Sequence, residues 1–298
     1  MKSPSARWLY FAPLAVLLGA SALCAWTLSV FLTGPVISQP ELRPQRRVAE
    51  DALVLAGSGS NLPLTRLLAE AWGRRVYLHE SIGSRGGVRA VRDGAIDLGL
   101  ISRPLREEEQ QGLVVWPYAR VAVVIASGSS VPEQDFDEAG LAQLYSGVRR
   151  TWPDGTALRV VQRELGDSSH DAVERHWLRF AEASHEAYRR QRWRVVYADA
   201  SMRAALLSER GSVGLFDQGA VRIEQLPLRI HRVEGVRPSP ETLESGAYPF
   251  SKDLSMLSVG PPSDLARDFL GFIYSDRGRD LTRRAGYLPL ERPAAERP

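Results

Sequence analysis

The sequence predicts an α/β protein built from two lobes. Short apolar strands and amphipathic helices alternate along most of the chain, which is typical of mostly parallel sheets. Three strands run into a turn rich in Gly, Ser, Asn or Asp, and a helix follows each turn directly. Near the C-terminus the pattern of the first lobe returns. We therefore expect two mostly parallel sheets, flanked by helices and joined by two hinge crossings.

The first lobe begins with short strands and one well-marked helix. The helix, at Leu62–Trp72, has Pro63 in its first turn and apolar residues at helical spacing. Strands are expected at Leu53–Ala56, Val76–Glu80 and Ile96–Ile101, followed by the apolar run Leu113–Ala126, which is broken at Pro117.

The segment from Ser81 to Leu105 is the most informative part of this lobe. Glycines 83, 86 and 87 are expected to let the backbone approach a ligand. Ser84 lies where a helix begins, and the free N–H groups of a helix start form an anion site. The next strand ends at Ser102 and Arg103, at the sheet edge where open α/β sheets bind ligands.

The second lobe is expected at residues 123–225, between the two parts of the first lobe at 51–122 and 226–298. Its helices are predicted at Leu141–Gly147, Asp171–Phe180 and Met202–Glu209, and its strands at Arg159–Arg163 and Gly211–Phe216. The chain then returns through Leu228–Val233, Asp253–Val259 and a last helix at Ser263–Ala285.

Residues 1–33 form a signal peptide or a membrane anchor. The stretch from Trp8 to Pro40 has no charged residue, and its apolar core is long enough to cross a bilayer. A signal peptide would be cut after Ala22. We favour an anchor that is kept, because the apolar run continues past that point to Leu32. Residues 34–50 form a stiff, proline-containing linker, and the rest of the chain is exported.

Composition excludes several classes of protein. The net charge is only +3, and arginine is spread along the chain without a basic block, so nucleic acid is not an expected partner. Cys24 is the only cysteine and lies in the N-terminal apolar segment. The folded part therefore has no disulfide and no cysteine metal site, and we expect no cofactor.

Three strand–turn–helix junctions can meet at one ligand. They are Gly57–Asn61 and Gly83–Gly87 in the first lobe and Gly166–Ser169 in the second. Each supplies backbone N–H donors and the positive end of a helix dipole. Arg163, at the end of a second-lobe strand, can reach the same point with a bidentate guanidinium.

With these motifs the chain resembles the periplasmic phosphate-binding proteins of ABC importers, from about Leu53 to Leu290. The resemblance rests on Ile82-Gly-Ser-Arg-Gly-Gly-Val88, Ile96-Asp-Leu-Gly99 and Ser102-Arg-Pro-Leu105, and on Leu144-Tyr-Ser-Gly147 with Trp152. It implies a two-lobed periplasmic-binding-protein fold that closes over a dehydrated anion, without catalysis. The phosphate-binding residues that it implies are Ser60, Asn61, Ser84, Arg103, Arg163, Ser168 and Ser169.

The chain departs from the family pattern at three positions. Asp167 replaces a serine, where it is a good N-cap but would repel an anion if it pointed into the site. Arg85 replaces the second serine of the glycine turn. Arg103 stands where some members carry the aspartate that receives the proton of hydrogen phosphate. Arg85 and Asp167 are therefore possible site residues, and sulfate should be less strongly rejected.

Three functions compete on this evidence. The first is capture of phosphate or a related oxyanion in the periplasm by a monomer that delivers it to an ABC permease of the inner membrane. The second is a membrane-anchored relative that senses or presents a ligand without transport. The third, a hydrolase using Ser168 to Asp171, is disfavoured because consecutive residues cannot form a nucleophile–base–orienter chain. We expect His170 on the surface of its helix.

Overall fold

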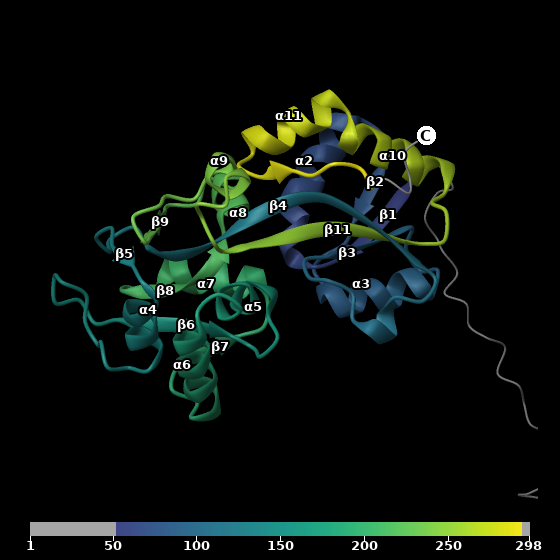
Figure 1. The fold of residues 1–298 in the computed structure, drawn as a ribbon. Coiled ribbons are helices and arrows are strands. Elements are labelled where there is room, and N and C mark those ends of the chain that lie inside the picture. The colour runs from purple at the N-terminus through teal and green to yellow at the C-terminus, as the bar shows by residue number, and fades with distance from the viewer. Residues whose placement is uncertain (1–51, 294–298) are drawn as a thin grey trace, which may run out of the picture. The chain divides into compact units, whose positions relative to one another are not determined.

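The structure is a computed structural model and describes residues 52–293 (Figure 1). The predicted signal peptide or anchor and the whole predicted linker lie outside these residues. Among residues 52–293, no helix combines the length and the apolar character needed to span a bilayer.

The described part is built on one mixed sheet. Its strands follow the order β2-β1-β3-β11-β4-β8-β6-β7. The first five are β2 (Val76–Leu78), β1 (Leu53–Gly57), β3 (Leu98–Ile101), β11 (Ser251–Val259) and β4 (Leu113–Gly128). The others are β8 (Ser212–Asp217), β6 (Arg159–Arg163) and β7 (Arg194–Val196), while β9 (Leu228–Ile230) and β12 (Leu288–Pro289) pair with β4. We call the half with β1 to β3 and β11 the first lobe, and the half with β6 to β8 the second.

Strand β4 runs through both lobes. Its first part pairs antiparallel with β11, and its last part pairs antiparallel with β8. The predicted break at Pro117 is wrong, because the strand continues past the proline and forms a β-bulge beside it. Leu254 pairs with Ala119 and Ser255 with Pro117, so Tyr118 is the extra residue. The two-lobed α/β fold is confirmed, and the parallel order is found in β2-β1-β3 and β8-β6-β7.

Helices cover both faces of the first lobe (Figure 1). Leu53 and Leu55 of β1 pack in one cluster with α2 (Leu62–Trp72) and α10 (Asp264–Tyr274). Val54 and Ala56 point the other way and pack with Val88 and Val91 of α3 (Gly83–Arg92). This alternation is the period of two that a strand buried on both faces requires.

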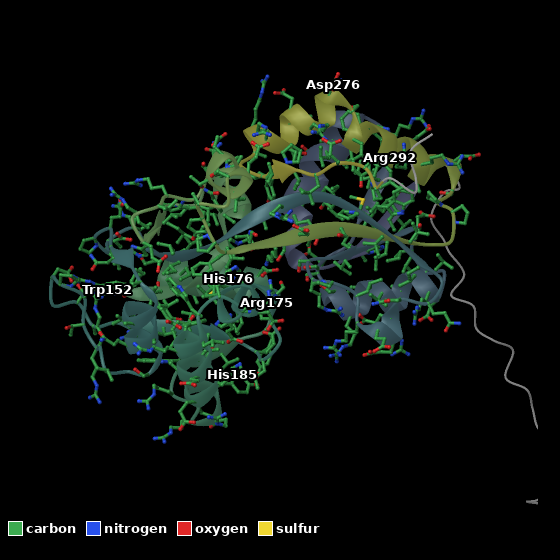
Figure 2. All side chains as sticks on the ribbon, in the orientation of Figure 1. Trp152, Arg175, His176, His185, Asp276 and Arg292 are labelled. Carbon is green, nitrogen blue, oxygen red and sulfur yellow. The ribbon has the colours of Figure 1, made fainter. Side chains whose placement is uncertain are left out.

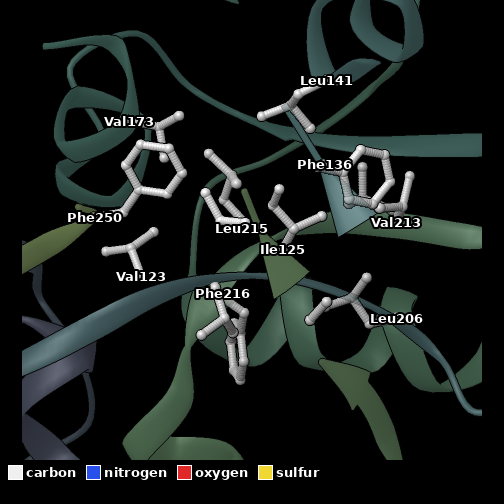
Figure 3. Close-up of a cluster of buried hydrophobic side chains, with 14 of the residues drawn as sticks. Val123, Ile125, Phe136, Leu141, Val173, Leu206, Val213, Leu215, Phe216 and Phe250 are labelled. Atoms are coloured by element: carbon white, nitrogen blue, oxygen red, sulfur yellow. The ribbon is translucent and has the colours of Figure 1, made fainter. Parts of the chain in front are cut away.

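The second lobe has its own apolar core. Figure 3 shows Val123 and Ile125 of β4 beside Leu215 of β8, with Val173 of α5 (Ser168–Glu174) on the same cluster. The other second-lobe helices are α4 (Glu138–Tyr145), α6 (Leu178–Arg189), α7 (Asp199–Ser208) and α8 (Gln218–Ile223). A small sheet pairs β10 (Arg232–Val233) with β5 (Asp135–Phe136). Short elements complete the chain: η1 (Gly59–Asn61), η2 (Glu107–Glu109) and α9 (Pro240–Glu244).

Two predicted helices are each divided in the structure. The helix expected at Asp171–Phe180 is α5 followed by α6, with Trp177 in an extended conformation between them. The last helix is α10 followed by α11 (Asp276–Arg284). Ser275 causes the second division: its backbone is extended and its hydroxyl accepts from Gly278 N, which is an N-cap.

Candidate ligand-binding cleft

A polar cleft of about 550 Å³ lies between residues of the two lobes. Ser58, Ser60 and Ser84 line it from the first lobe. Arg163, the turn Gly166–Ser168 and the segment Tyr197–Asp199 line it from the second. The structure thus brings together the three strand–turn–helix junctions that the sequence singled out.

The ammonium group of Lys252, on β11, lies between the junctions Gly57–Asn61 and Gly166–Ser169. Its Nζ atom donates to Ser60 Oγ at 2.8 Å, Ser169 Oγ at 2.8 Å and Ser168 Oγ at 3.2 Å. It also forms an ion pair of 2.9 Å with Asp217 Oδ1, and both side chains are buried. Burial raises the pKa of the Asp217 carboxyl, and the charge of Lys252 opposes that rise. Sequence reasoning missed both residues. The available signal was composition, since only two of the 38 basic residues, Lys2 and Lys252, are lysines.

A chain of serine hydroxyls leads from Lys252 across the cleft. Ser168 Oγ lies 3.0 Å from Ser102 Oγ, which lies 2.8 Å from Ser58 Oγ. Ser84 Oγ accepts a bond of 3.3 Å from Ser102 N. Hydroxyl groups of both lobes are therefore linked in one network, and Ser84 is part of it as the sequence suggested.

Arg163 has three carboxylate partners. Its guanidinium contacts Asp199 at 2.8 Å, Glu164 at 3.1 Å and Asp167 at 3.2 Å. Burial alone would lower the pKa of Arg163, but the charges of Asp167 and Asp199 outweigh it and raise that pKa. The arginine is held firmly at the cleft, and an incoming anion has to share it with these carboxylates.

Asp167 is the N-cap of α5, as its residue type indicated. Its Oδ1 accepts from Ser169 N at 3.1 Å and from His170 N at 3.2 Å. Burial would raise the pKa of Asp167, but the hydrogen bond from His170 and the charge of Arg163 lower it overall. Because Asp167 uses these two amides, α5 presents the hydroxyls of Ser168 and Ser169 rather than its bare N–H groups. The starts of η1 and α3, by contrast, have no side-chain cap.

Arg103 lines the cleft, but its guanidinium is bound by a carboxylate, and Asn61 is bound inside the first lobe. Arg103 forms a bidentate pair with Glu109, at 2.7 and 2.8 Å. That hydrogen-bonded pair lowers the pKa of Glu109 to about 2. Asn61 is buried and donates to Tyr118 Oη at 3.2 Å and to Ser255 O at 3.3 Å. Arg85 is exposed on α3 and lines the cleft.

Two expectations for individual residues are wrong. A Cβ atom on Gly87 would lie 2.9 Å from Leu100 O and 3.0 Å from Gly57 Cα, so Gly87 serves the close packing of α3 on the sheet. His170 is not a surface residue: only 3% of it is exposed, and its ring contacts Tyr145 Oη at 3.3 Å and Asp167 Oδ1 at 3.4 Å.

A second cavity, of about 650 Å³, shares Ser102, Arg103 and Ser168 with the cleft as lining residues. Lys252, Arg175 and His176 are among the residues that line it, and Figure 2 labels the last two. Within residues 52–293 no group of His, Cys, Asp and Glu side chains is suited to hold a metal ion. The chemistry of the cleft is that of hydrogen-bond donors and fixed charges.

A two-lobed α/β fold with a polar cleft between the lobes defines a binding protein of the periplasmic type. A family model described as "PBP superfamily domain" matches residues 44–277, and the chain belongs to this superfamily. In keeping with this, the phosphate-binding protein PstS of Staphylococcus aureus (strain bovine RF122 / ET3-1) is 20% identical over 260 residues, which cover 78% of this chain and 76% of the relative.

Solved structures show the same fold. A Clostridium perfringens protein, described as a phosphate ABC transporter substrate-binding protein with bound phosphate, aligns with a TM-score of 0.68 at 20% identity, covering 80% of this chain and all of that one. An ABC-type phosphate transport receptor of Vibrio cholerae aligns with a TM-score of 0.57 at 19% identity, over 79% of this chain and 99% of the other.

Proposed function

We propose that the protein captures inorganic phosphate, or a closely related tetrahedral oxyanion, between its two lobes and delivers it to an ABC importer. The observation that carries this proposal is the meeting of serine hydroxyls from two of the strand–turn–helix junctions, one in each lobe, at one buried ammonium group. Membership of the binding-protein superfamily supports it, as do relatives described as phosphate-binding proteins.

The ligand would be held by the residues that face the network from both lobes. Ser58 and Ser84 in the first lobe and Arg163 in the second would contact it, and Ser60, Ser168 and Ser169 would support these contacts through their bonds to Lys252. Arg85 would add positive charge at the rim. Asn61 and Arg103 would act indirectly, since the first binds Tyr118 and the second binds Glu109.

The protein would work outside the cytoplasm as a monomer without catalytic activity. Its N-terminal segment, with no charged residue from Trp8 to Pro40, would hold it in the inner membrane beside the permease that it serves. Mass spectrometry of the mature N-terminus tests this arrangement. A chain that begins at Met1 supports the anchor, and one that begins near Leu23 replaces it with a cleaved signal peptide.

Calorimetry tests the binding function. The full-length protein is titrated with phosphate, arsenate, sulfate and molybdate at neutral pH. We expect binding of phosphate, and its loss in Arg163→Ala, because the guanidinium is the buried cation on the second-lobe side. Arg189→Ala, an exposed arginine on α6, is the matched control. Absence of heat with all four anions would exclude the function.

A further inference from the structure

We infer that Lys252 is a positioning residue that fixes the direction of the serine hydroxyl network, so that the cleft presents O–H donors to an anion. The inference rests on the proposed function and names a residue that acts through others rather than by contact with the ligand. It starts from the count of donors and acceptors around the Nζ atom.

An ammonium group has three N–H donors and no acceptor. Four oxygen atoms surround the Nζ atom of Lys252: the hydroxyls of Ser60, Ser168 and Ser169, and a carboxylate oxygen of Asp217. A serine hydroxyl can normally rotate and act as donor or acceptor. Because the ammonium group offers no acceptor, each of the three hydroxyls turns its oxygen toward Nζ and directs its proton elsewhere.

The orientation of each hydroxyl group then fixes whether the next hydroxyl donates or accepts. Ser168 donates to Ser102, and Ser102 in turn donates to Ser58, over the contacts of 3.0 and 2.8 Å. Ser58 is left with a free hydroxyl proton at the cleft wall, whereas Ser60 donates its proton to the carboxylate of Asp217. The hydroxyl proton of Ser84 is also free to be donated, because the Ser84 oxygen already accepts from Ser102 N. Two hydroxyl donors, those of Ser58 and Ser84, therefore face the cleft.

Asp217 neutralises the positive charge of Lys252. Its carboxylate lies 2.9 Å from Nζ, and both side chains are at most 5% exposed. The pair is neutral as a whole, so its effect at the cleft wall is the orientation of hydroxyl groups rather than long-range attraction. An oxyanion, whose unprotonated oxygens accept hydrogen bonds, fits this wall, and a cationic ligand does not.

The test uses a variant that removes both charges. Lys252→Met alone leaves Asp217 buried without its partner and is expected to lose stability. The double variant Lys252→Met/Asp217→Asn removes that defect. We expect it to fold like the wild type by circular dichroism and to bind phosphate about 10- to 100-fold more weakly in calorimetry, because the hydroxyls lose their fixed direction.

Two controls separate a positioning role from a structural one. Phe269→Leu, in the core of the first lobe, lowers stability without touching the network and should bind phosphate as the wild type does. The weakening in the double variant should be the same at low and at high ionic strength, since the pair that it removes is neutral. Wild-type affinity in the double variant, or a weakening that disappears in salt, would overturn the inference. If the wild type binds no oxyanion, the proposed function fails instead, and this inference fails with it.

Discussion

The imidazole of His231 stacks on the indole of Trp152, with ring centroids 5.9 Å apart and an interplanar angle of 22°. His231 is fully buried, its Nδ1 accepts from Gln134 N at 3.0 Å, and its Nε2 lies 2.9 Å from Ser127 Oγ. Burial lowers the pKa of His231 to about 4. The ring is therefore neutral in the folded protein at pH values where an exposed histidine is charged.

This depressed pKa makes stability depend on pH. The unfolded chain takes up a proton near pH 6.5 and the folded one near pH 4, so stability falls as pH drops through that window. We expect wild type to lose about 2–3 kcal/mol between pH 7 and pH 4.5 from this residue. His231→Asn, whose Oδ1 can still accept from Gln134 N, should not show this pH-dependent loss of unfolding free energy when it is unfolded in urea. An unchanged pH slope would contradict the assignment.

The pair of Arg103 and Glu109 should stabilise the fold without contributing to anion affinity. Glu109→Gln is expected to lower the unfolding free energy by about 1.5–3 kcal/mol at pH 7, because a charge-assisted pair is lost. The pKa of Glu109 is about 2 when folded, so this difference should persist above pH 4.5 and vanish as pH falls toward 2. Exposed Glu108→Gln is the control. A large loss of phosphate affinity in Glu109→Gln would instead show that Arg103 contributes to anion binding.

Asp199 should compete with the ligand for Arg163. Its Oδ1 lies 2.8 Å from Arg163 Nη1 at the cleft wall. Asp199→Asn removes a negative charge there and should raise phosphate and sulfate affinity about 3- to 10-fold in calorimetry. Glu186→Gln, on the exposed face of α6, should leave both affinities unchanged. If Asp199→Asn weakens phosphate alone, the carboxylate instead accepts the proton of hydrogen phosphate.

Gly57 should tolerate no side chain. Its φ is +149°, and a Cβ atom there would lie 2.1 Å from Leu100 O in the neighbouring strand. Gly57→Ala should destabilise the protein by about 3 kcal/mol or more, through overpacking and backbone strain together. Gly271, in α10, has open space around its Cβ position, and Gly271→Ala should stabilise the helix by about 0.5–1 kcal/mol. Equal effects of the two substitutions would contradict this view of Gly57.

Local signals in the sequence were sufficient for much of the fold. Helix α2 has its predicted bounds because Pro63 marks its first turn and Gly73, with φ of 80°, ends it. Strand β6 likewise has its predicted bounds, Arg159–Arg163. The divisions at Trp177 and Ser275 were missed, because each is a single cap residue within a continuous amphipathic pattern.

The centre of the candidate site depends on contacts that local patterns do not contain. Lys252 meets Ser60 across 192 residues and Ser169 across 83. The sequence predicts the element on which each of these residues lies, but it does not show how those elements pack against one another. Arg163 and Asp167 are four residues apart, and their ion pair could be expected, whereas the partnership of Arg163 with Asp199 could not.

The position of β11 has a consequence for synthesis of the chain. This strand, at residues 251–259, is inserted between β3 and β4, which are complete more than a hundred residues earlier. Until β11 is available for pairing, β3 and β4 each have an open edge that can pair with other chains. The second lobe, whose strands β6 to β8 lie entirely between these points, can form its sheet first. The first lobe is thus the last part to mature, and a chain truncated before residue 251 leaves it with two unprotected edges.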